Sequence, residues 1–232
     1  MSNKKVDTDN TGYFSVSESL DGFTDSSRRI ATGATTFFRN PELLRQLTNT
    51  VLPSLASSGN RFHVWCAGCS TGMEVYSIAM VVLDWMDVNR CPLQCKILGS
   101  DISDEALGIA RTGRYPSLKK LNQPNSILFN RYMLDDGNGS AVIGKELRAV
   151  TVFKQRDIAL GSRSHKFELV VCDHVFQYFT ETRQYEYLER LMAACQPHGF
   201  IYVSTPLNQV ITEITNRYPV NKFAKHFYRL KG

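Results

Sequence analysis

Several features that define common protein classes are scarce or absent in this sequence of 232 residues. No stretch approaches the roughly 20 consecutive apolar residues of a membrane span, and the N-terminus lacks the apolar core of a secretory signal. The 27 basic residues only slightly outnumber the 22 acidic ones and occur singly or in pairs such as Arg28-Arg29, without the concentrated basic stripe of a nucleic-acid binder. We therefore expect a cytoplasmic protein with no membrane insertion and no nucleic-acid partner.

The six cysteines do not indicate disulfides or a metal site. Without a secretory signal, they are expected to be reduced thiols. Cys66, Cys69, Cys91 and Cys95 have ligand-like spacings. However, Cys66 ends one predicted strand and Cys95 begins the next, so they would lie roughly 13 Å apart at opposite edges of a sheet, at about 3.3 Å per residue. We therefore predict no metal site.

The chain divides into a polar tail and one domain. Residues 1–28 are rich in Ser, Asp, Asn, Thr and Gly, a composition with too little apolar surface to offset the entropy of ordering. The sequence is 43% hydrophobic overall, enough for one sizeable core. We predict a flexible tail over 1–28 and a single folded domain over 29–232.

From residue 62 onward, strand-like and helix-like segments alternate. Short apolar runs predict strands, and longer amphipathic or apolar runs predict helices, one ending at Gly113 and another capped by Thr180. The predicted strands are 62–66, 95–102, 167–173 and 200–205, and the predicted helices are 74–88, 104–113 and 180–196. This βαβα order favours an α/β fold with a twisted, mainly parallel sheet flanked by helices, which residues 225–230 could close as a last strand.

Between residues 115 and 157 the periodicity breaks. The segments NRYMLDD (130–136) and RAVTVFKQ (148–155) are strand-like and flank the turn-rich DDGNGS. We predict a small antiparallel β excursion from the edge of the main sheet, near the active site.

Glycines and an acid follow the first two predicted strands. Gly68 and Gly72 allow a sharp turn and a close approach of the backbone to a ligand, and Asp101 could accept both hydroxyls of a ribose. Ligands of open parallel sheets bind at the carboxyl ends of the strands, so these residues indicate a nucleoside pocket. The phosphate loops G-x-G-x-x-G and G-x-x-x-x-G-K-[ST] are absent, which favours S-adenosylmethionine over NAD or ATP. Such a glycine turn can also serve packing alone.

Four segments carry a resemblance to a known family: TTFFRN at 35–40, VWCAGCSTGMEVYSIAM at 64–80, GSDISDEALGIARTGRYP at 99–116 and FELVVCDHVFQYF at 167–179. In this order they resemble the CheR family of chemotaxis-receptor methyltransferases, over about residues 30–206. The resemblance implies a Rossmann-like class I methyltransferase fold. It also implies S-adenosylmethionine as cofactor, S-adenosylhomocysteine as product, and methylation of glutamate side chains on bacterial receptors.

The resemblance further implies roles for single residues, with Arg39 and Tyr178 as the catalytic pair. The implied cofactor-binding residues are Thr35, Arg39, Gly68, Cys69, Ser70, Gly72, Glu74, Asp101, Ile102, Asp157, Ile158, Asp173 and His174. Taken alone, Arg39 could be a surface arginine at a helix start and Tyr178 a packed aromatic. Asp101 could also cap the next helix, although Ser103 is better placed for that.

The sequence departs from the family pattern at three places. Gly33 stands where the family usually has Asn, Met73 replaces the first acid of an acidic pair, and Asp173-His174 replaces Arg-Asn. Asp173 would repel an incoming carboxylate, or else contact a cationic group of the cofactor. His174 could serve as a base for a hydroxyl or amine acceptor. Only the polar tail precedes Arg29, so we expect no N-terminal helical domain.

Three functions remain open at this point. The first is methyl transfer to glutamate carboxylates of a protein, a chemoreceptor or another signalling protein. The second is a methyltransferase with the same cofactor pocket that acts on another protein or a small molecule. The third is a non-catalytic S-adenosylmethionine-binding interaction module, and the sequence does not determine the oligomeric state.

Overall fold

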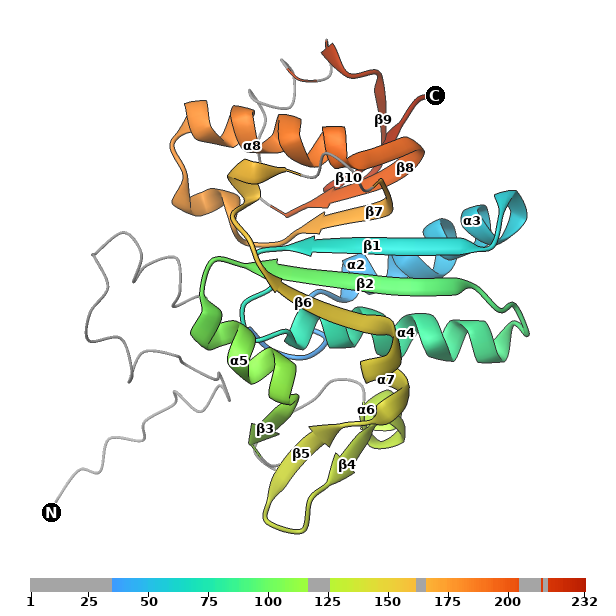
Figure 1. Ribbon diagram of the computed structural model, residues 1–232. Helices are drawn as coiled ribbons and strands as arrows, with labels where there is room; N and C mark the ends of the chain where they lie inside the picture. The colour runs from blue at the N-terminus through green and yellow to red at the C-terminus, as the bar shows by residue number, and fades with distance from the viewer. Residues whose placement is uncertain (1–34, 117–125, 162–165, 205–213, 215–216) are drawn as a thin grey trace, which may run out of the picture.

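The protein is built around a seven-stranded sheet (Figure 1). The computed structural model describes residues 35–116, 126–161, 166–204, 214 and 217–232. In spatial order the strands are β6 (Thr151–Gln155), β2 (Gln94–Asp101), β1 (Arg61–Ala67), β7 (Phe167–Cys172), β8 (Cys195–Val203), β10 (Phe227–Leu230) and β9 (Val220–Ala224). The first five strands run parallel, and β10 is antiparallel to both of its neighbours. The predicted Rossmann-like, mainly parallel sheet is confirmed.

Strand β1 lies at the point where the strand order reverses. The chain passes from β1 to β2 on one side, and later places β7 on the other side of β1. In open α/β sheets the crevice at such a switch point, outside the carboxyl ends of the strands, is where ligands bind. The fold therefore directs attention to the segments that follow β1, β2 and β7.

Helices cover both faces of the sheet, and strand alternation explains why. Phe62, Val64 and Cys66 of β1 point into one core, whereas Trp65 and Ala67 point into the other. The first core also holds side chains of α2 (Pro41–Gln46), η1 (Leu47–Val51), α3 (Leu52–Ser58), α4 (Met73–Val88), α5 (Asp104–Thr112) and α7 (Lys145–Val150). The second is covered by α8 (Glu181–Ala194) and η2 (Ile158–Leu160), so α4 and α8 lie on opposite sides of the sheet in Figure 1.

The predicted helix and strand positions agree with the structure to within a few residues, with two local corrections. Ser103 caps α5 by accepting from the Ala106 N–H at 3.1 Å, and Gly113 ends that helix in the left-handed region. Thr180 occupies the N-cap of α8, but its side chain makes no capping hydrogen bond. Strand β8 begins at Cys195, so residues 197–199, which separate the predicted helix 180–196 from the predicted strand 200–205, lie within the strand, where its pairing with β7 shifts register.

The predicted antiparallel excursion exists, but its strands differ from those expected. It is a three-stranded sheet of β3 (Arg114–Pro116), β5 (Ser140–Ile143) and β4 (Met133–Asp135). The segment NRYMLDD contributes only its last part to β4, because its first part lies in α6 (Ser126–Tyr132). RAVTVFKQ is not part of the excursion: it ends α7 and forms β6, which pairs in parallel with β2 in the main sheet.

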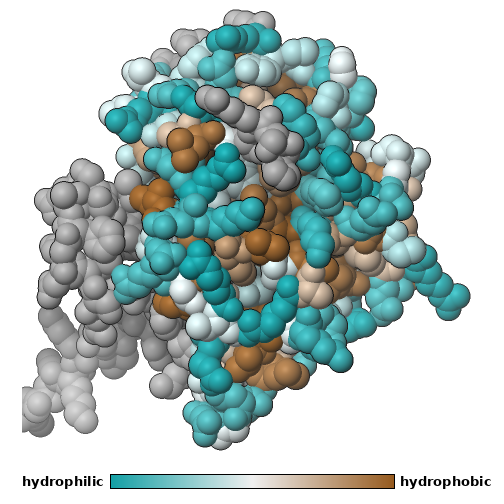
Figure 2. Space-filling model, viewed as in Figure 1, coloured by the Kyte–Doolittle hydropathy of each residue, from teal (hydrophilic) through white to brown (hydrophobic). Residues whose placement is uncertain are grey.

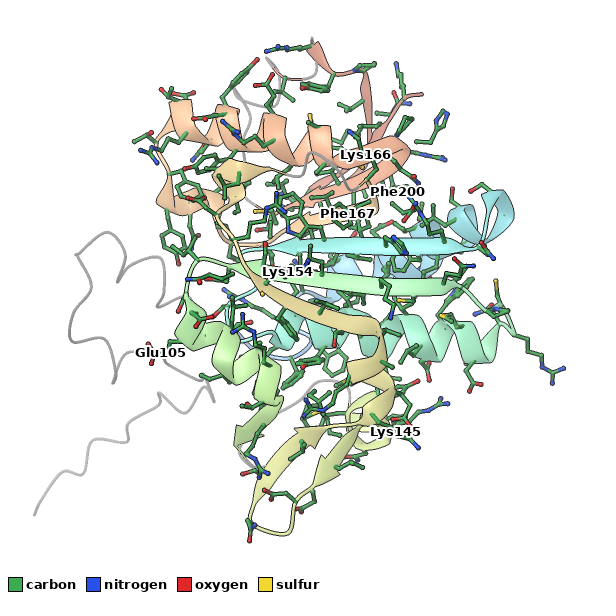
Figure 3. The ribbon with its side chains drawn as sticks, in the orientation of Figure 1. Glu105, Lys145, Lys154, Lys166, Phe167 and Phe200 are labelled. Atoms are coloured by element: carbon green, nitrogen blue, oxygen red, sulfur yellow. The ribbon has the colours of Figure 1, made fainter. Side chains whose placement is uncertain are left out.

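The outer surface is mostly polar. Figure 2 shows hydrophilic residues over most of the viewed face, with hydrophobic residues in separate groups between them. Figure 3 places Phe167 and Phe200 in the sheet, whereas Glu105 and Lys145 extend from α5 and α7. None of the helices that the structure describes has the length and apolar character to cross a bilayer. The predicted tail over 1–28 lies outside the described residues.

Candidate functional site

A cavity of about 250 Å³ lies at the carboxyl ends of β1, β2 and β7. The structure brings nearly all of the residues singled out in the sequence to its wall. These are Thr35, Arg39, Gly68, Cys69, Ser70, Glu74, Asp101, Ile102, Asp157, Ile158, Asp173, His174 and Tyr178. They come from segments up to 143 residues apart in the chain, which converge because parallel strands end at the same edge. Of the residues singled out in the sequence, Gly72 does not line the cavity.

The two glycines of the first turn have different roles. Gly68 has φ +77°, and a Cβ there would collide with the side chain of Val175. Gly72 has φ +83° at the N-cap of α4, and a Cβ there would lie 2.8 Å from Ala110 Cβ, against α5. The missing side chain of Gly68 therefore leaves room for Val175 at the cavity, whereas that of Gly72 lets α5 pack closely against the start of α4.

Asp101 at the end of β2 is held by the backbone. One carboxylate oxygen accepts from the Ser70 N–H at 2.7 Å, and the other accepts from the Ser103 N–H at 3.0 Å. Burial raises the pKa of Asp101, and backbone N–H groups, including those of Ser103 and Ser70, oppose that shift. Each oxygen retains a lone pair, so the carboxylate can still accept two hydroxyl groups from a ligand in the cavity.

A pair of carboxyl groups forms another part of the wall. Glu74, in the first turn of α4, lies close enough to Asp173, which follows β7, for the two carboxyl groups to interact electrostatically. The pKa of Glu74 is raised well above its ordinary value, first by burial and then by the charge of Asp173, while Arg39 acts in the opposite direction. Two buried acids this close cannot both ionise without a cation nearby.

The segment before α2 is held in place by aromatic packing. The Phe37 ring packs edge-on against Tyr115 and Phe129, with ring centroids 5.0 and 5.1 Å away. The Phe38 N–H donates to Ser77 Oγ at 2.9 Å, which fixes the backbone beside α4. This leaves Thr35 and Arg39 at the cavity, so the two phenylalanines of T-x-FFR serve as the anchor for the polar residues around them.

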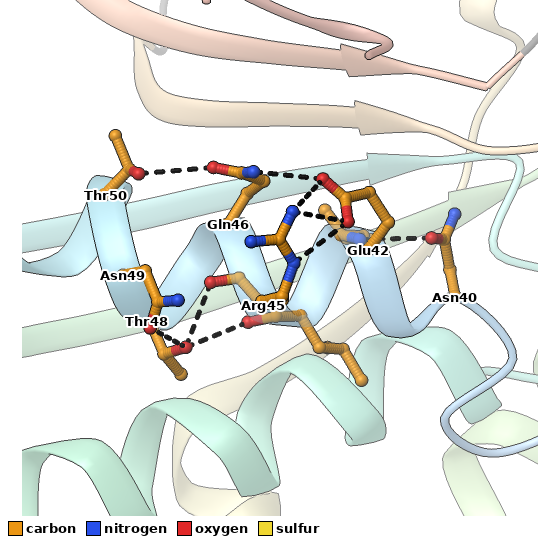
Figure 4. Close-up of polar contacts among 9 residues, drawn as sticks. Asn40, Glu42, Arg45, Gln46, Thr48, Asn49 and Thr50 are labelled. Carbon is orange, nitrogen blue, oxygen red and sulfur yellow. Dashed lines mark hydrogen bonds and ion pairs between the residues drawn. The ribbon is translucent and has the colours of Figure 1, made fainter. Parts of the chain in front are cut away.

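Asn40 is a site residue that sequence reasoning missed. Its Oδ1 caps α2 by accepting from the Leu43 N–H at 3.1 Å (Figure 4), and its Nδ2 donates to Asp173 Oδ2 at 3.4 Å and to the Tyr202 hydroxyl. Glu42, Arg45 and Gln46 form exposed pairs along the same helix. The sequence signal was only a helix cap before Pro41, and the link to Asp173 arises from tertiary structure.

Another part of the cavity wall includes apolar and aromatic side chains. Asp157 accepts from the Ala159 N–H at 2.8 Å and so begins η2, which presents the buried Ile158. Tyr178, in the short helix η3 (Phe176–Tyr178), is 38% exposed at the rim. Here too the sequence missed residues: Arg156, Arg183 and Tyr187 line the cavity. The Arg183 guanidinium donates to the Tyr187 hydroxyl at 3.1 Å.

The residues around the cavity show no arrangement typical of a metal site. No group of three or more His, Cys, Asp or Glu side chains in the described part of the chain could hold a metal ion. Cys66 pairs with Gly99 and Cys95 with Phe62, so the two cysteines are separated along neighbouring strands as expected. Burial raises the pKa of the Cys69 thiol well above its ordinary value, which makes it a poor nucleophile at neutral pH.

The fold and the cavity together define an α/β domain that binds a nucleoside-containing cofactor. The family model described as "CheR methyltransferase, SAM binding domain" matches residues 33–222, and this chain belongs to that family, whose cofactor is S-adenosylmethionine. The resemblance seen in the four sequence segments is thereby confirmed.

Curated relatives support the same assignment. The chemotaxis protein methyltransferase of Borreliella burgdorferi is 33% identical over 160 residues, covering 66% of this chain and 56% of the relative. Chemotaxis protein methyltransferase 2 of Pseudomonas aeruginosa is 31% identical over 186 residues, covering 78% of this chain and 65% of the relative. The chain thus spans between 56% and 65% of the length of these two relatives.

Proposed function

We propose that this chain is an S-adenosylmethionine-dependent methyltransferase that methylates glutamate carboxylates of a protein. The observation that carries the proposal is the position of Asp101, buried at the end of β2 beside the Gly68 turn, with free lone pairs on both oxygens. Family membership and the convergence of the predicted residues on one cavity support it. The names of the relatives indicate a chemotaxis protein as acceptor.

The cavity has a suitable group for each part of the cofactor. Asp101 would accept the two ribose hydroxyls, and Ile102 and Ile158 would enclose the adenine between apolar side chains, beside Asp157. Gly68 would allow the ligand to lie against the backbone. Arg39, together with Thr35, would bind the α-carboxylate, because a guanidinium presents a planar fork of donors that matches a carboxylate.

Methyl transfer to a carboxylate requires mainly that the acceptor and the cofactor are held in the correct relative position. S-adenosylmethionine supplies an activated methyl group on a sulfonium. The residues of this chain would hold an acceptor carboxylate in line with that methyl group, so that the new O–C bond would replace the S–C bond and leave its electron pair on sulfur. A glutamate is already ionised at pH 7, so no general base is required. Tyr178 at the rim would orient the acceptor oxygen by its hydroxyl.

One observation favours a second candidate. Asp173 and His174 line the cavity where the family usually has Arg-Asn, and His174 is held at φ +55° with its N–H donating to Ser204 Oγ at 2.8 Å. The His174 side chain is 42% exposed, so it could meet an acceptor. A hydroxyl or amine acceptor on another protein or a small molecule would find a base there. A binding module without turnover is the third candidate.

Methyl-labelled S-adenosylmethionine distinguishes these candidates. The chain is incubated with the label and with a receptor-like glutamate peptide or a cell extract, and the products are treated with mild base. Protein label that base releases supports carboxyl esters, and base-stable label supports the second candidate. Tight cofactor binding without any label supports the module. A Tyr178→Phe variant should bind the cofactor normally but transfer methyl more slowly.

A further inference from the structure

The side chain of Asp173 is nearly buried, and one of its carboxylate oxygens accepts no hydrogen bond among the described residues. Its side chain is only 6% exposed, yet it lines the cavity. Oδ2 accepts from Asn40 Nδ2 at 3.4 Å, whereas Oδ1 accepts no hydrogen bond from any residue that the structure describes. The His174 ring nitrogen Nε2 is 3.7 Å from Oδ1, beyond hydrogen-bonding distance. A buried acceptor without a donor is rare in native proteins, and here it borders the space for a ligand.

The charges around Asp173 do not balance without a ligand. Glu74 adds a second carboxyl from α4, Arg39 is close enough to lower the pKa of Glu74, and the His174 ring, 3.7 Å from Oδ1, carries a charge only when it is protonated. On the remaining sides, Asn40 and Tyr202 are neutral, and His226, in the turn between β9 and β10, is disfavoured as a cation by burial and by nearby lysines, which lower its pKa. The cavity therefore favours a cationic group next to Glu74 and Asp173.

The geometry restricts the kind of cation. A primary ammonium has three N–H donors, enough for Asp173 Oδ1, for Glu74 and for one further acceptor. A sulfonium is positive but has no hydrogen to donate, so it would leave Oδ1 without a partner. The carboxylate of an acceptor would be repelled by the same pair.

We propose that Asp173, together with Glu74, binds the α-ammonium group of the cofactor's methionyl moiety. This inference rests on the proposed function. In an amino acid the ammonium and the carboxylate sit on one carbon, so a site for both must place an anion beside a cation. Arg39 lies near enough to Glu74 to affect its charge, which satisfies that requirement. Asp173 thus becomes a specificity-determining residue for the cofactor, at a position where the family usually has Arg.

The test compares three ligands on two proteins. Binding of S-adenosylmethionine, S-adenosylhomocysteine and an S-adenosylhomocysteine analogue that lacks the α-amino group is measured by calorimetry on the natural chain and on Asp173→Asn. The variant should weaken both amino-bearing ligands by about 10- to 100-fold and leave the desamino analogue within about twofold. The natural chain itself should bind the desamino analogue more weakly than S-adenosylhomocysteine, a comparison that does not depend on how the variant folds. Asp104→Asn, a substitution of the same kind at an exposed ion pair on α5, should match the natural chain.

Each other outcome overturns the inference. Weaker binding of all three ligands would indicate a general structural role for Asp173, and weaker binding of S-adenosylmethionine alone would assign it to the sulfonium. Unchanged binding with slower methyl transfer would place Asp173 against the acceptor. If the natural chain binds neither S-adenosylmethionine nor S-adenosylhomocysteine, the proposed function fails as well, which separates the two failures.

Discussion

An acidic side chain lies at each end of strand β7, and the two differ in how completely they are hydrogen-bonded. At its beginning, the Glu168 side chain is 3% exposed, and both of its oxygens accept hydrogen bonds: one accepts from Arg61 Nε at 2.7 Å and the other from the His63 N–H at 2.6 Å. Just past its end, Asp173 is nearly as buried but leaves Oδ1 without a hydrogen bond among the described residues. Both side chains are nearly buried at an end of the same strand, so the difference in their hydrogen bonding comes from the residues around them.

The comparison teaches how to separate structural acids from binding acids. Glu168 joins β7 to β1 at the edge where the parallel strands begin, and its charge is already compensated by Arg61. Asp173 and Glu74 lie at the edge where ligands bind, and their charge is compensated only in part. An acid satisfied by its own chain stabilises the fold, whereas an acid left unsatisfied beside a cavity indicates a ligand.

The largest effect on stability is expected at the satisfied end. Glu168→Ala leaves the His63 N–H without its acceptor and removes the partner of Arg61. Because Arg61 is half exposed, we expect a loss of about 2 to 3 kcal/mol in the free energy of unfolding, measured with urea. Cofactor affinity, measured by calorimetry, should remain close to that of the natural chain. Glu186→Ala, which breaks an exposed pair with Arg190, should cost less than about 1 kcal/mol.

The largest effect on binding is expected at Asp101. Asp101→Ala removes the acceptor for the ribose hydroxyls, so cofactor affinity should fall by about 1.5 to 3 kcal/mol, the range for hydrogen bonds to a charged group. Unchanged affinity by calorimetry would contradict the assignment of Asp101. Circular dichroism should show that the fold is retained. Asp104→Ala, only a few residues further on, provides the matched control.

Glu74 is expected to lower the stability of the fold at neutral pH. Its raised pKa means that the folded state holds a proton more tightly than the unfolded state, so stability is lost as pH rises above about 4.5 through the folded pKa. Glu74→Gln cannot ionise and should raise Tm by a few degrees at pH 7, with no difference from the natural chain below about pH 4. Thermal unfolding across pH measures this, and Glu105→Gln on the exposed side of α5 should give no such gain.

The smallest effect on the cofactor is expected in the antiparallel excursion. Residues 136–139 join β4 to β5, which begins at Ser140, and Asp136 pairs with Arg114 across the small sheet. None of the described residues between 103 and 155 lines the cavity. Replacing this loop should therefore change cofactor affinity by less than about twofold while altering which acceptor is labelled. A loss of cofactor binding would argue against a separate acceptor surface there.

How far the sequence predicts this protein depends on the range of each interaction. The glycine turn, the Ser103 cap and the apolar run of β1 are local patterns, and their positions were predicted within a few residues. By contrast, the strand-like sequence of RAVTVFKQ is equally compatible with a strand of the excursion and with a strand of the main sheet. Pairing with β2 decided between them, through contacts made more than 50 residues away.

The candidate site divides in the same way. Strand ends and the glycine turn predicted that the turn after β1 and the acid after β2 lie together, the family resemblance added the T-x-FFR segment, and all three line one cavity. Only the tertiary structure decided which acids are compensated. Asn40 and Asp173 are 133 residues apart in the sequence, and Glu168 and Arg61 are 107 residues apart. Charge and hydrogen-bond balance depend on neighbours brought together by sheet packing, so no local pattern could distinguish Glu168 from Asp173.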